Sequence, residues 1–271
     1  MKQYDTVVLG ASAFACGMAL CAPGRVCILE RGILLAPEYT AALHRPVLSA
    51  AQTDAGRRLR RELSERGIAV GDRVHLPPVA DVLALLLTEC RAQMLLQCET
   101  VDMVPEADGY LLKVMATDGI GQLRARRIVD TTPEGFRSAG VDAIARRAIC
   151  AALLGHAAAP LPEQPIPTEV GQVTVYTGAL PDEYLMRLEL PRGAGFGEAR
   201  RRLHRAFRSA APRLPGLLFG AEAVAMVNEY DGAVCRSMSP AEGAPFDWIP
   251  SGQYGDLIEA LEEGCTWISQ H

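Results

Sequence analysis

The sequence predicts an α/β fold in which a parallel sheet is followed by a smaller, β-rich part. Short runs of β-branched apolar residues, typical of buried parallel strands, alternate along the chain with helical segments. Two Asp-Gly turns, at Asp108-Gly109 and Asp118-Gly119, indicate an antiparallel meander. A Pro-rich stretch at 159–167 is typical of a linker. We therefore expect one domain formed by residues 1–160 and 246–271, and a second, smaller domain formed by residues 161–245.

The first domain is predicted to open on a βαβ unit. Thr6–Leu9 and Val26–Leu29 have the pattern of buried strands. Between them, Ala13–Cys21 is a run of small residues typical of a helix, and Pro23-Gly24 ends it. The next segment, residues 33–49, holds two prolines and is predicted to be irregular.

The remaining elements are predicted from the period of their apolar residues. Helices are expected over Asp54–Arg66, Val79–Arg91, Ala139–Leu154, Gly197–Ala210 and Asp256–Ser269. Strands are expected over Met94–Cys98, Thr100–Val104, Tyr110–Thr117, Gln122–Arg126, Arg127–Asp130, Gln172–Tyr176, Tyr184–Leu190 and Ala221–Asn228.

Composition excludes several classes of function. Apolar residues make up 49% of the 271 residues and charged residues 22%, which is typical of a globular chain. The net charge of −5 argues against a nucleic-acid partner, and two arginine-rich helices are interpreted as solvated faces. No segment reaches the roughly 20 apolar residues of a membrane span. Residues 6–22 could imitate a secretory signal, but Asp5 interrupts its expected basic start.

The eight cysteines form no Cys-x-x-Cys pair, and none has a histidine at metal-ligand spacing. We therefore expect no metal site. Three of the cysteines lie in the apolar N-terminal run, where a reduced cysteine acts as a small apolar residue. The simplest interpretation is a cytoplasmic protein with reduced cysteines and no redox disulfide.

The turn after the first strand is the first candidate site. It takes the place of a Gly-x-Gly-x-x-Gly turn, in which the backbone approaches a diphosphate at a helix N-terminus. Here Ser12 replaces the second glycine and Ala15 the third. A hydroxyl at the second position would either crowd the phosphate or hydrogen-bond it. The candidate residues are Gly10, Ala11, Ser12, Ala13, Phe14 and Ala15.

Glu30 ends the second predicted strand, 20 residues after Gly10. An acidic side chain at this position can accept hydrogen bonds from an adenosine ribose, and it disfavours NADP. Arg31 follows it and is a further candidate. The alternative is a charged residue that only marks the end of a strand.

The segments "YDTVVLGASAFACGMAL" and "VCILERG" resemble the opening of FAD-dependent oxidoreductases of the glutathione-reductase-like superfamily, especially its short bacterial members. The resemblance extends to residues 74–136 and 246–271. It implies a Rossmann-type domain that binds FAD, a hydride transfer to the flavin, and a small-molecule substrate. The superfamily's Ala-Thr-Gly turn is replaced here by Thr131-Thr132-Pro133, so Thr131 and Thr132 are candidates. Proline removes a backbone N–H donor at this turn.

The resemblance also implies a closing Gly-Asp pair beside the cofactor. Gly255-Asp256 and Ser251-Gly252 both align with it, and the first is preferred because Asp256 would cap the last helix. Asp256 could equally be a plain helix cap. His44-Arg45 could lie near the flavin or in an exposed loop, and no catalytic residue is assigned.

Two other functions stay open. The altered turns could mark a degenerate flavoprotein fold that serves as a structural or regulatory subunit, with a redox partner protein or a second copy of the chain. The N-terminal pattern is also shared with NAD-binding proteins.

Overall fold

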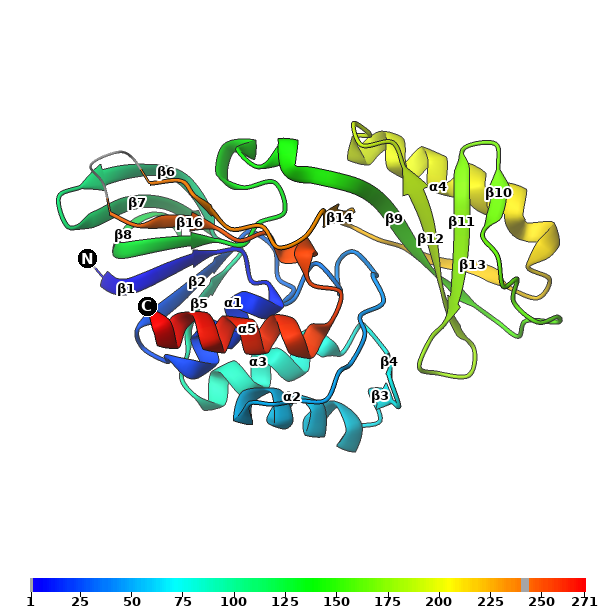
Figure 1. Ribbon diagram of the computed structural model, residues 1–271, viewed down its shortest axis with the longest axis horizontal. Coiled ribbons are helices and arrows are strands. Elements are labelled where there is room, and N and C mark those ends of the chain that lie inside the picture. Colours follow the sequence, from blue (N-terminus) through cyan, green and yellow to red (C-terminus); the bar gives the residue numbers. More distant parts are fainter. Residues whose placement is uncertain (1, 240–243) are drawn as a thin grey trace.

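The computed structural model describes residues 2–239 and 244–271 and contains two large sheets (Figure 1). Neighbouring strands of the first sheet follow the order β15-β16-β8-β1-β2-β5, and β7 pairs β8 and β6. Its strands are β1 (Lys2–Leu9), β2 (Val26–Glu30), β5 (Gln93–Leu96), β6 (Glu99–Glu106), β7 (Gly109–Ala116), β8 (Gly119–Asp130), β15 (Arg236–Ser237) and β16 (Phe246–Trp248). The α/β class is as the sequence predicts.

The N-terminal βαβ unit is confirmed. β1 pairs in parallel with β2 on one side and with β8 on the other, with Leu9 opposite Leu29 and Asp130. Both strands next to β1 come later in the chain: β2 follows directly after α1, and β8 follows only after the other strands of the sheet's far side, so β1 stands where the strand order changes direction. Helix α1 (Ala13–Cys21) has the predicted bounds. The carboxyl ends of β1, β2 and β8 consequently meet at one edge of the sheet.

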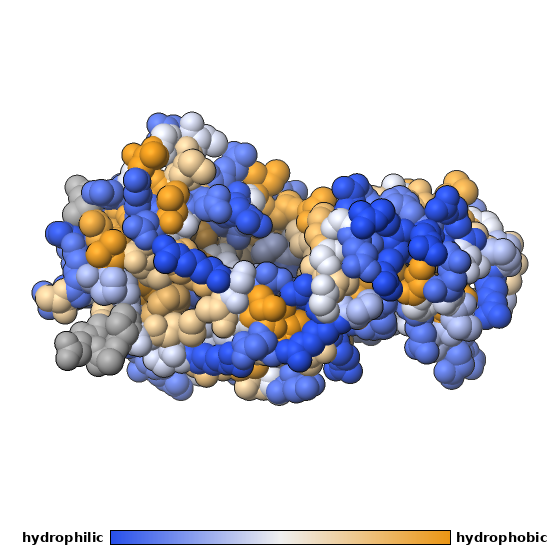
Figure 2. Space-filling view, turned by 90° about the horizontal axis from the view of Figure 1, so that it is seen from above, coloured by the Kyte–Doolittle hydropathy of each residue, from blue (hydrophilic) through white to orange (hydrophobic). Residues whose placement is uncertain are grey.

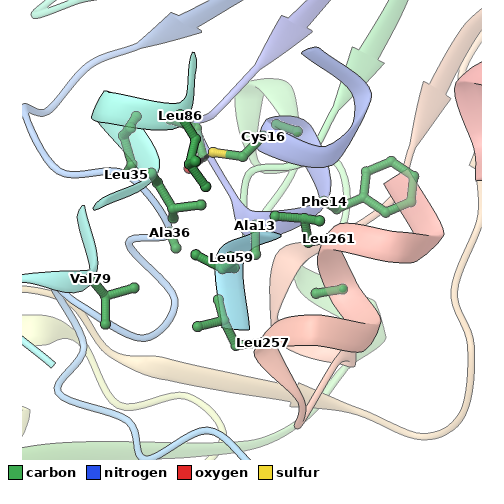
Figure 3. Packing of buried hydrophobic residues seen from close by; sticks show 14 of the residues in the cluster. Ala13, Phe14, Cys16, Leu35, Ala36, Leu59, Val79, Leu86, Leu257 and Leu261 are labelled. Atoms are coloured by element: carbon green, nitrogen blue, oxygen red, sulfur yellow. Dashed lines mark hydrogen bonds between the residues drawn. The ribbon is translucent and has the colours of Figure 1, made fainter. Parts of the chain in front are cut away.

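Helices cover one face of this sheet (Figure 1). They are α1, α2 (Asp54–Glu65), α3 (Val79–Glu89) and α5 (Leu257–Gln270). Their apolar side chains form one core with residues of the irregular segment, such as Leu35 and Ala36 (Figure 3). Helices α1 and α5 cross closely at two glycines. A Cβ on Gly17 would lie 1.9 Å from the Leu261 carbonyl oxygen, and a Cβ on Gly264 would lie 2.0 Å from the Phe14 carbonyl oxygen, so glycine is required at both positions.

One cysteine prediction is wrong. Cys21, at the end of α1, and Cys265, in α5, form a disulfide across 244 residues of sequence. Spacing along the chain could not reveal this pair, because the close crossing of α1 and α5 brings it together. The other six cysteines are free thiols.

The predicted meander of β6, β7 and β8 is part of this first sheet, and β6 and β7 lie on the side away from the helices (Figure 1). Both Asp-Gly turns connect its strands. The two strands predicted over Gln122–Arg126 and Arg127–Asp130 are one continuous strand, β8. Its first half pairs with β7 and its second half pairs with β1.

The second sheet is antiparallel and has α4 (Phe196–Ala210) packed against it. Its strand order is β10-β11-β12-β9-β13, and β14 also pairs with β9. These strands are β9 (Ile144–Leu154), β10 (Ile166–Thr168), β11 (Gly171–Thr177), β12 (Glu183–Leu190), β13 (Leu218–Glu222) and β14 (Val227–Tyr230). The single strand predicted over Ala221–Asn228 is therefore two, β13 and β14.

The helix predicted over Ala139–Leu154 is wrong. Most of this segment is β9, the strand that pairs with β12, β13 and β14. Its alanines, leucines and arginines favour a helix locally, but pairing on both edges overrides that preference. β9 precedes residue 161, where the sequence places the start of the second domain. The domain boundary stays a prediction.

The predicted irregular segment, residues 33–49, contains no helix and only a single-residue bridge from Val47 to Asp256. It contacts both sheets. The backbone N–H groups of Val224 and Ala225 donate to the Ala41 carbonyl, at 2.9 and 3.2 Å. After α2, the chain forms the short ribbon β3 (Ala69–Val70) and β4 (Arg73–Val74). Within residues 2–239 and 244–271, no helix is long and apolar enough to span a membrane.

Candidate functional site

A cavity of about 780 Å³ lies at the carboxyl ends of β1, β2 and β8 and extends to the second sheet. The surface is hollowed between the two parts of the molecule (Figure 2). Six predicted site residues line the cavity: Gly10, Ser12, Glu30, Arg31, Thr131 and Thr132. From the other side it is lined by residues 224–228, beside and within β14, and by His44.

In the turn after β1, the serine at the second glycine position has a structural role. Ser12 is only 1% exposed, and it caps α1 by accepting a hydrogen bond from Ala15 N–H to its Oγ at 3.1 Å. Gly10 has a φ of +87°, and a Cβ there would lie 3.0 Å from Thr131 Oγ1. Glycine at position 10 is therefore required by the backbone turn and by its contact with the turn after β8.

Glu30 closes β2 and faces the cavity. Its Oε2 accepts from Ala11 N–H at 2.8 Å, and its Oε1 accepts from Gly32 N–H at 2.6 Å. These two bonds hold the carboxylate beside the turn that follows β1. Each carboxylate oxygen has a second acceptor position, so Glu30 can also accept from hydroxyl groups of a ligand.

Glu38, in the irregular segment, reaches the first turn of α1 with its side chain, and it was not among the predicted site residues. Its Oε1 accepts from Ala13 N–H at 2.8 Å, while Oε2 is buried with no hydrogen-bond partner among the described residues. Burial raises the pKa of Glu38 to about 8; the Ala13 N–H lowers it and Glu30 raises it further. The sequence contains a signal that could have identified it, because Glu38 is the only charged residue between Ile33 and Leu43.

The turn after β8 is closed by its own hydrogen bonds. Asp130 is fully buried, and its Oδ1 accepts from the backbone N–H and the hydroxyl of Thr132, at 2.9 and 2.6 Å. Its Oδ2 accepts from Phe136 N–H. Burial raises the pKa of Asp130 to about 6, and these three bonds oppose the shift. The Thr131 hydroxyl donates to the carbonyls of Leu9 and Gly10, at 3.0 and 3.1 Å.

The end of the cavity at the second sheet carries polar groups with spare capacity. Asn228, in β14, is 6% exposed, and its Oδ1 has no hydrogen-bond partner in the described part of the chain. His44 lies 3.4 Å from the Arg187 guanidinium, measured from Nδ1 to Nη1. Burial, and then Arg187, lower the pKa of His44 to about 4. The imidazole is therefore neutral at neutral pH.

The other predicted residues do not line this cavity. Ala11, Ala13, Phe14 and Ala15 lie behind the turn, and their alanine and phenylalanine side chains are buried in the helical core. Asp256 is confirmed as the cap of α5: its Oδ1 accepts from the N–H groups of Ile258 and Glu259, at 2.8 and 3.0 Å. Ser251 and Gly252 line the cavity, whereas Gly255 and Asp256 do not. Contact of any of these residues with a cofactor stays a prediction.

Comparison with known proteins gives the fold. No family model matches the chain, and no curated protein matches it. The solved structure of NikD, an amino acid oxidase of nikkomycin biosynthesis, superposes with a TM-score of 0.64 at 12% identity and covers 99% of this chain and 94% of NikD. CndH, a myxobacterial FAD-dependent halogenase, superposes with a TM-score of 0.62 at 13% identity, over 99% of this chain and 73% of its own.

Aklavinone-11 hydroxylase, solved with FAD and aklavinone, superposes with a TM-score of 0.59 at 11% identity. The match covers all of this chain but only 62% of the hydroxylase. At these identities the comparisons show the fold alone. The chain has the fold of these oxidoreductases, which include an enzyme solved with FAD and one that depends on FAD.

Proposed function

We propose that the chain binds FAD in the cavity between its two sheets and acts as an FAD-dependent oxidoreductase on a small molecule. The observation that carries the proposal is the course of the cavity, which extends from Glu30 past the first turn of α1 to β14. In open α/β sheets, ligands bind at the carboxyl ends of the strands where the strand order reverses. This cavity begins at that point.

The residues that line the cavity are suited to bind most parts of a dinucleotide. Glu30 has free acceptor positions for ribose hydroxyls, and Gly10 and Ser12 keep side chains small where the cavity passes α1. A volume of about 780 Å³ lies within the roughly 300–1,000 Å³ of small-molecule and cofactor sites. Bound FAD would supply a hydride acceptor. One residue disagrees with this fit, because Glu38 already accepts the Ala13 N–H that a diphosphate would use.

The end of the cavity at the second sheet is suited to position a substrate. The unpartnered Oδ1 of Asn228 would accept a hydrogen bond from a substrate N–H or O–H, because a buried acceptor without a partner costs about 1–3 kcal/mol. Neutral His44 would accept or donate a single hydrogen bond without adding charge. Met226 and Val227 add apolar surface beside them. These groups favour an uncharged substrate that carries a hydroxyl or amide donor.

Titration of FAD against the purified chain tests the proposal. We expect one FAD per chain, and we expect Glu30→Arg to weaken binding at least about tenfold, because it removes the ribose acceptor and the anchor of the Ala11–Ser12 turn. Glu163→Arg makes the same charge change at an exposed position and serves as the control. Equal affinity of the Glu30→Arg variant and the wild type would refute the ribose role.

A second candidate is a non-catalytic subunit that keeps the fold, acting with a redox partner protein or a second copy of this chain. Glu38 favours it, because a carboxyl group of the chain itself bonds the first turn of α1 in place of a phosphate. A protein that is colourless as purified and takes up neither FAD nor NAD would support this candidate. Uptake of NAD in preference to FAD would instead assign the cavity to a nicotinamide dinucleotide.

A further inference from the structure

The carboxyl group of Glu38 lies where the proposed function requires a phosphate. The first turn of a helix presents N–H groups without helical partners and a partial positive charge, which together attract an anion. In α1, Ser12 Oγ accepts the Ala15 N–H, and Glu38 Oε1 accepts the Ala13 N–H at 2.8 Å. An internal side chain therefore already holds the position that a diphosphate would occupy.

The second oxygen of Glu38 has unused hydrogen-bonding capacity. Oε2 is buried and has no hydrogen-bond partner among the described residues, and Glu38 lines the cavity beside Ser12. When the carboxyl group is neutral, it carries one O–H donor in addition to its acceptor capacity. A neutral Glu38 can thus accept from Ala13 N–H with one oxygen and donate to a phosphate with the other. An ionised Glu38 can only accept, and it adds a negative charge.

Among the described residues, the titratable groups that face Glu38 supply no compensating cation. Glu30 faces it from the end of β2, Cys16 from α1, and Tyr39 is its neighbour in the irregular segment. Glu30 is an acid, and burial raises the pKa of both Cys16 and Tyr39, so neither carries charge at neutral pH. The charge at this end of the cavity is therefore decided by Glu38 itself, beside Glu30.

We propose that Glu38 determines whether the α1 end of the cavity accepts a phosphate group: the neutral carboxyl admits a diphosphate and the ionised carboxylate excludes it. The inference rests on the proposed function, because it concerns how the same cavity takes a dinucleotide. Glu38 acts on the ligand's phosphates and makes no contact with a reacting atom, so it is a specificity-determining residue.

If Glu38 acts in this way, the affinity for a dinucleotide falls as pH rises. The pKa of Glu38 is raised to about 8, so the carboxyl group is neutral below that pH and ionises above it. Binding that requires one bound proton weakens as pH rises through this value, approaching about tenfold per pH unit above it. Glu38→Gln keeps an acceptor and a donor but cannot ionise. Its affinity should stay constant over the same pH range.

The experiment measures FAD and ADP-ribose affinity by calorimetry from about pH 6.5 to about pH 9.5, where the diphosphate keeps its charge. The proteins are the full-length wild type, Glu38→Gln, and Glu163→Gln as an exposed control with the same change in charge. We expect a loss of about tenfold or more for the wild type and the control over this range, and no loss for Glu38→Gln. The amide resonance of Ala13 reports the contact directly: it should move with pH in the wild type and not in Glu38→Gln.

The outcomes separate the two proposals. Binding of both ligands with the same pH dependence in wild type and Glu38→Gln would overturn the role of Glu38 and leave the proposed function standing. Binding by Glu38→Gln alone would support the exclusion and overturn FAD binding by the natural chain. Failure of every protein to bind either ligand at any pH would overturn both.

Discussion

Two turns at the same edge of the first sheet each hold a buried carboxyl group, and they differ in how that group is satisfied. In the turn after β8, both oxygens of Asp130 accept backbone or hydroxyl hydrogens of the same loop. At the first turn of α1, only one oxygen of Glu38 has a partner among the residues that the structure describes, and the other is buried beside the cavity. A carboxyl group that is fully bonded holds a loop together, whereas one that is half bonded has capacity left for a ligand.

The largest expected effect sharpens this contrast. Asp130→Ala would leave two N–H groups, those of Thr132 and Phe136, and the Thr132 hydroxyl without their acceptor, which costs about 3–5 kcal/mol of unfolding free energy. Glu38→Ala would leave a single N–H, that of Ala13, without an acceptor, and should cost about 1–2 kcal/mol. Urea unfolding of both variants measures the difference. Equal losses would show that the two carboxyl groups play the same structural part.

A second contrast appears in the pH dependence of stability. The pKa of Glu38 is raised to about 8 in the folded chain. Its contribution to the unfolding free energy is therefore complete below the pKa that Glu38 has in the unfolded chain, and it is lost as pH rises through 8. Asp130, with a pKa of about 6, and His44, with a pKa of about 4, have finished titrating in the folded state by about pH 7. From about pH 6.5 to 8 the wild type should lose about 2 kcal/mol of unfolding free energy.

Glu38→Gln should lose much less over the same range, because the amide does not ionise. Denaturant unfolding of both proteins at matched pH values gives the two slopes. A wild-type stability that is constant between about pH 6.5 and 8 would contradict a raised pKa at Glu38.

Gly10→Ala tests the contact between the two turns. The φ of +87° at Gly10 is unfavourable for alanine, and the added Cβ would lie 3.0 Å from Thr131 Oγ1. We expect a loss of about 1–3 kcal/mol in thermal or urea unfolding. A matched change, Gly24→Ala, has a similar φ of +83° with nothing within 4 Å of the new Cβ. The excess loss at Gly10 measures the packing against Thr131, and equal losses would mean that the contact contributes nothing.

The smallest effect is expected at Ser12, which caps α1. Ser12→Ala removes the acceptor of the Ala15 N–H and should cost about 1 kcal/mol. If Ser12 also contacts a bound phosphate, the stabilisation by added FAD should fall as well. Thermal unfolding with and without FAD separates the two effects, and a loss confined to the free protein would limit Ser12 to its capping role.

The parts of the fold that the sequence predicted are those with local signals. The first βαβ unit follows from a period of apolar residues and a Gly10 turn, and Asp256 follows from a helix-capping pattern. β9 was predicted as a helix because its own residues favour one. Its partners lie in β12, β13 and β14, further along the chain, where no local pattern reports the pairing.

The site residues also divide into those that a local sequence pattern identifies and those that it does not. Glu30 was found because strand end and spacing identify it, and it lies at the cavity. Glu38 was missed because it lies in an irregular segment, where no period relates it to α1, although a lone acid among apolar residues was visible. Asn228 was missed because its burial depends on the pairing of β14 with β9.

The visible absorption spectrum tests the central claim most directly. The purified chain is incubated with excess FAD at about pH 6.5, where Glu38 is expected to be neutral, and free FAD is removed by gel filtration. The account predicts that flavin absorption stays with the protein at one FAD per chain, and that Glu30→Arg retains less. A wild type that is colourless after this treatment would contradict it, whether or not the Glu38→Gln variant retains flavin.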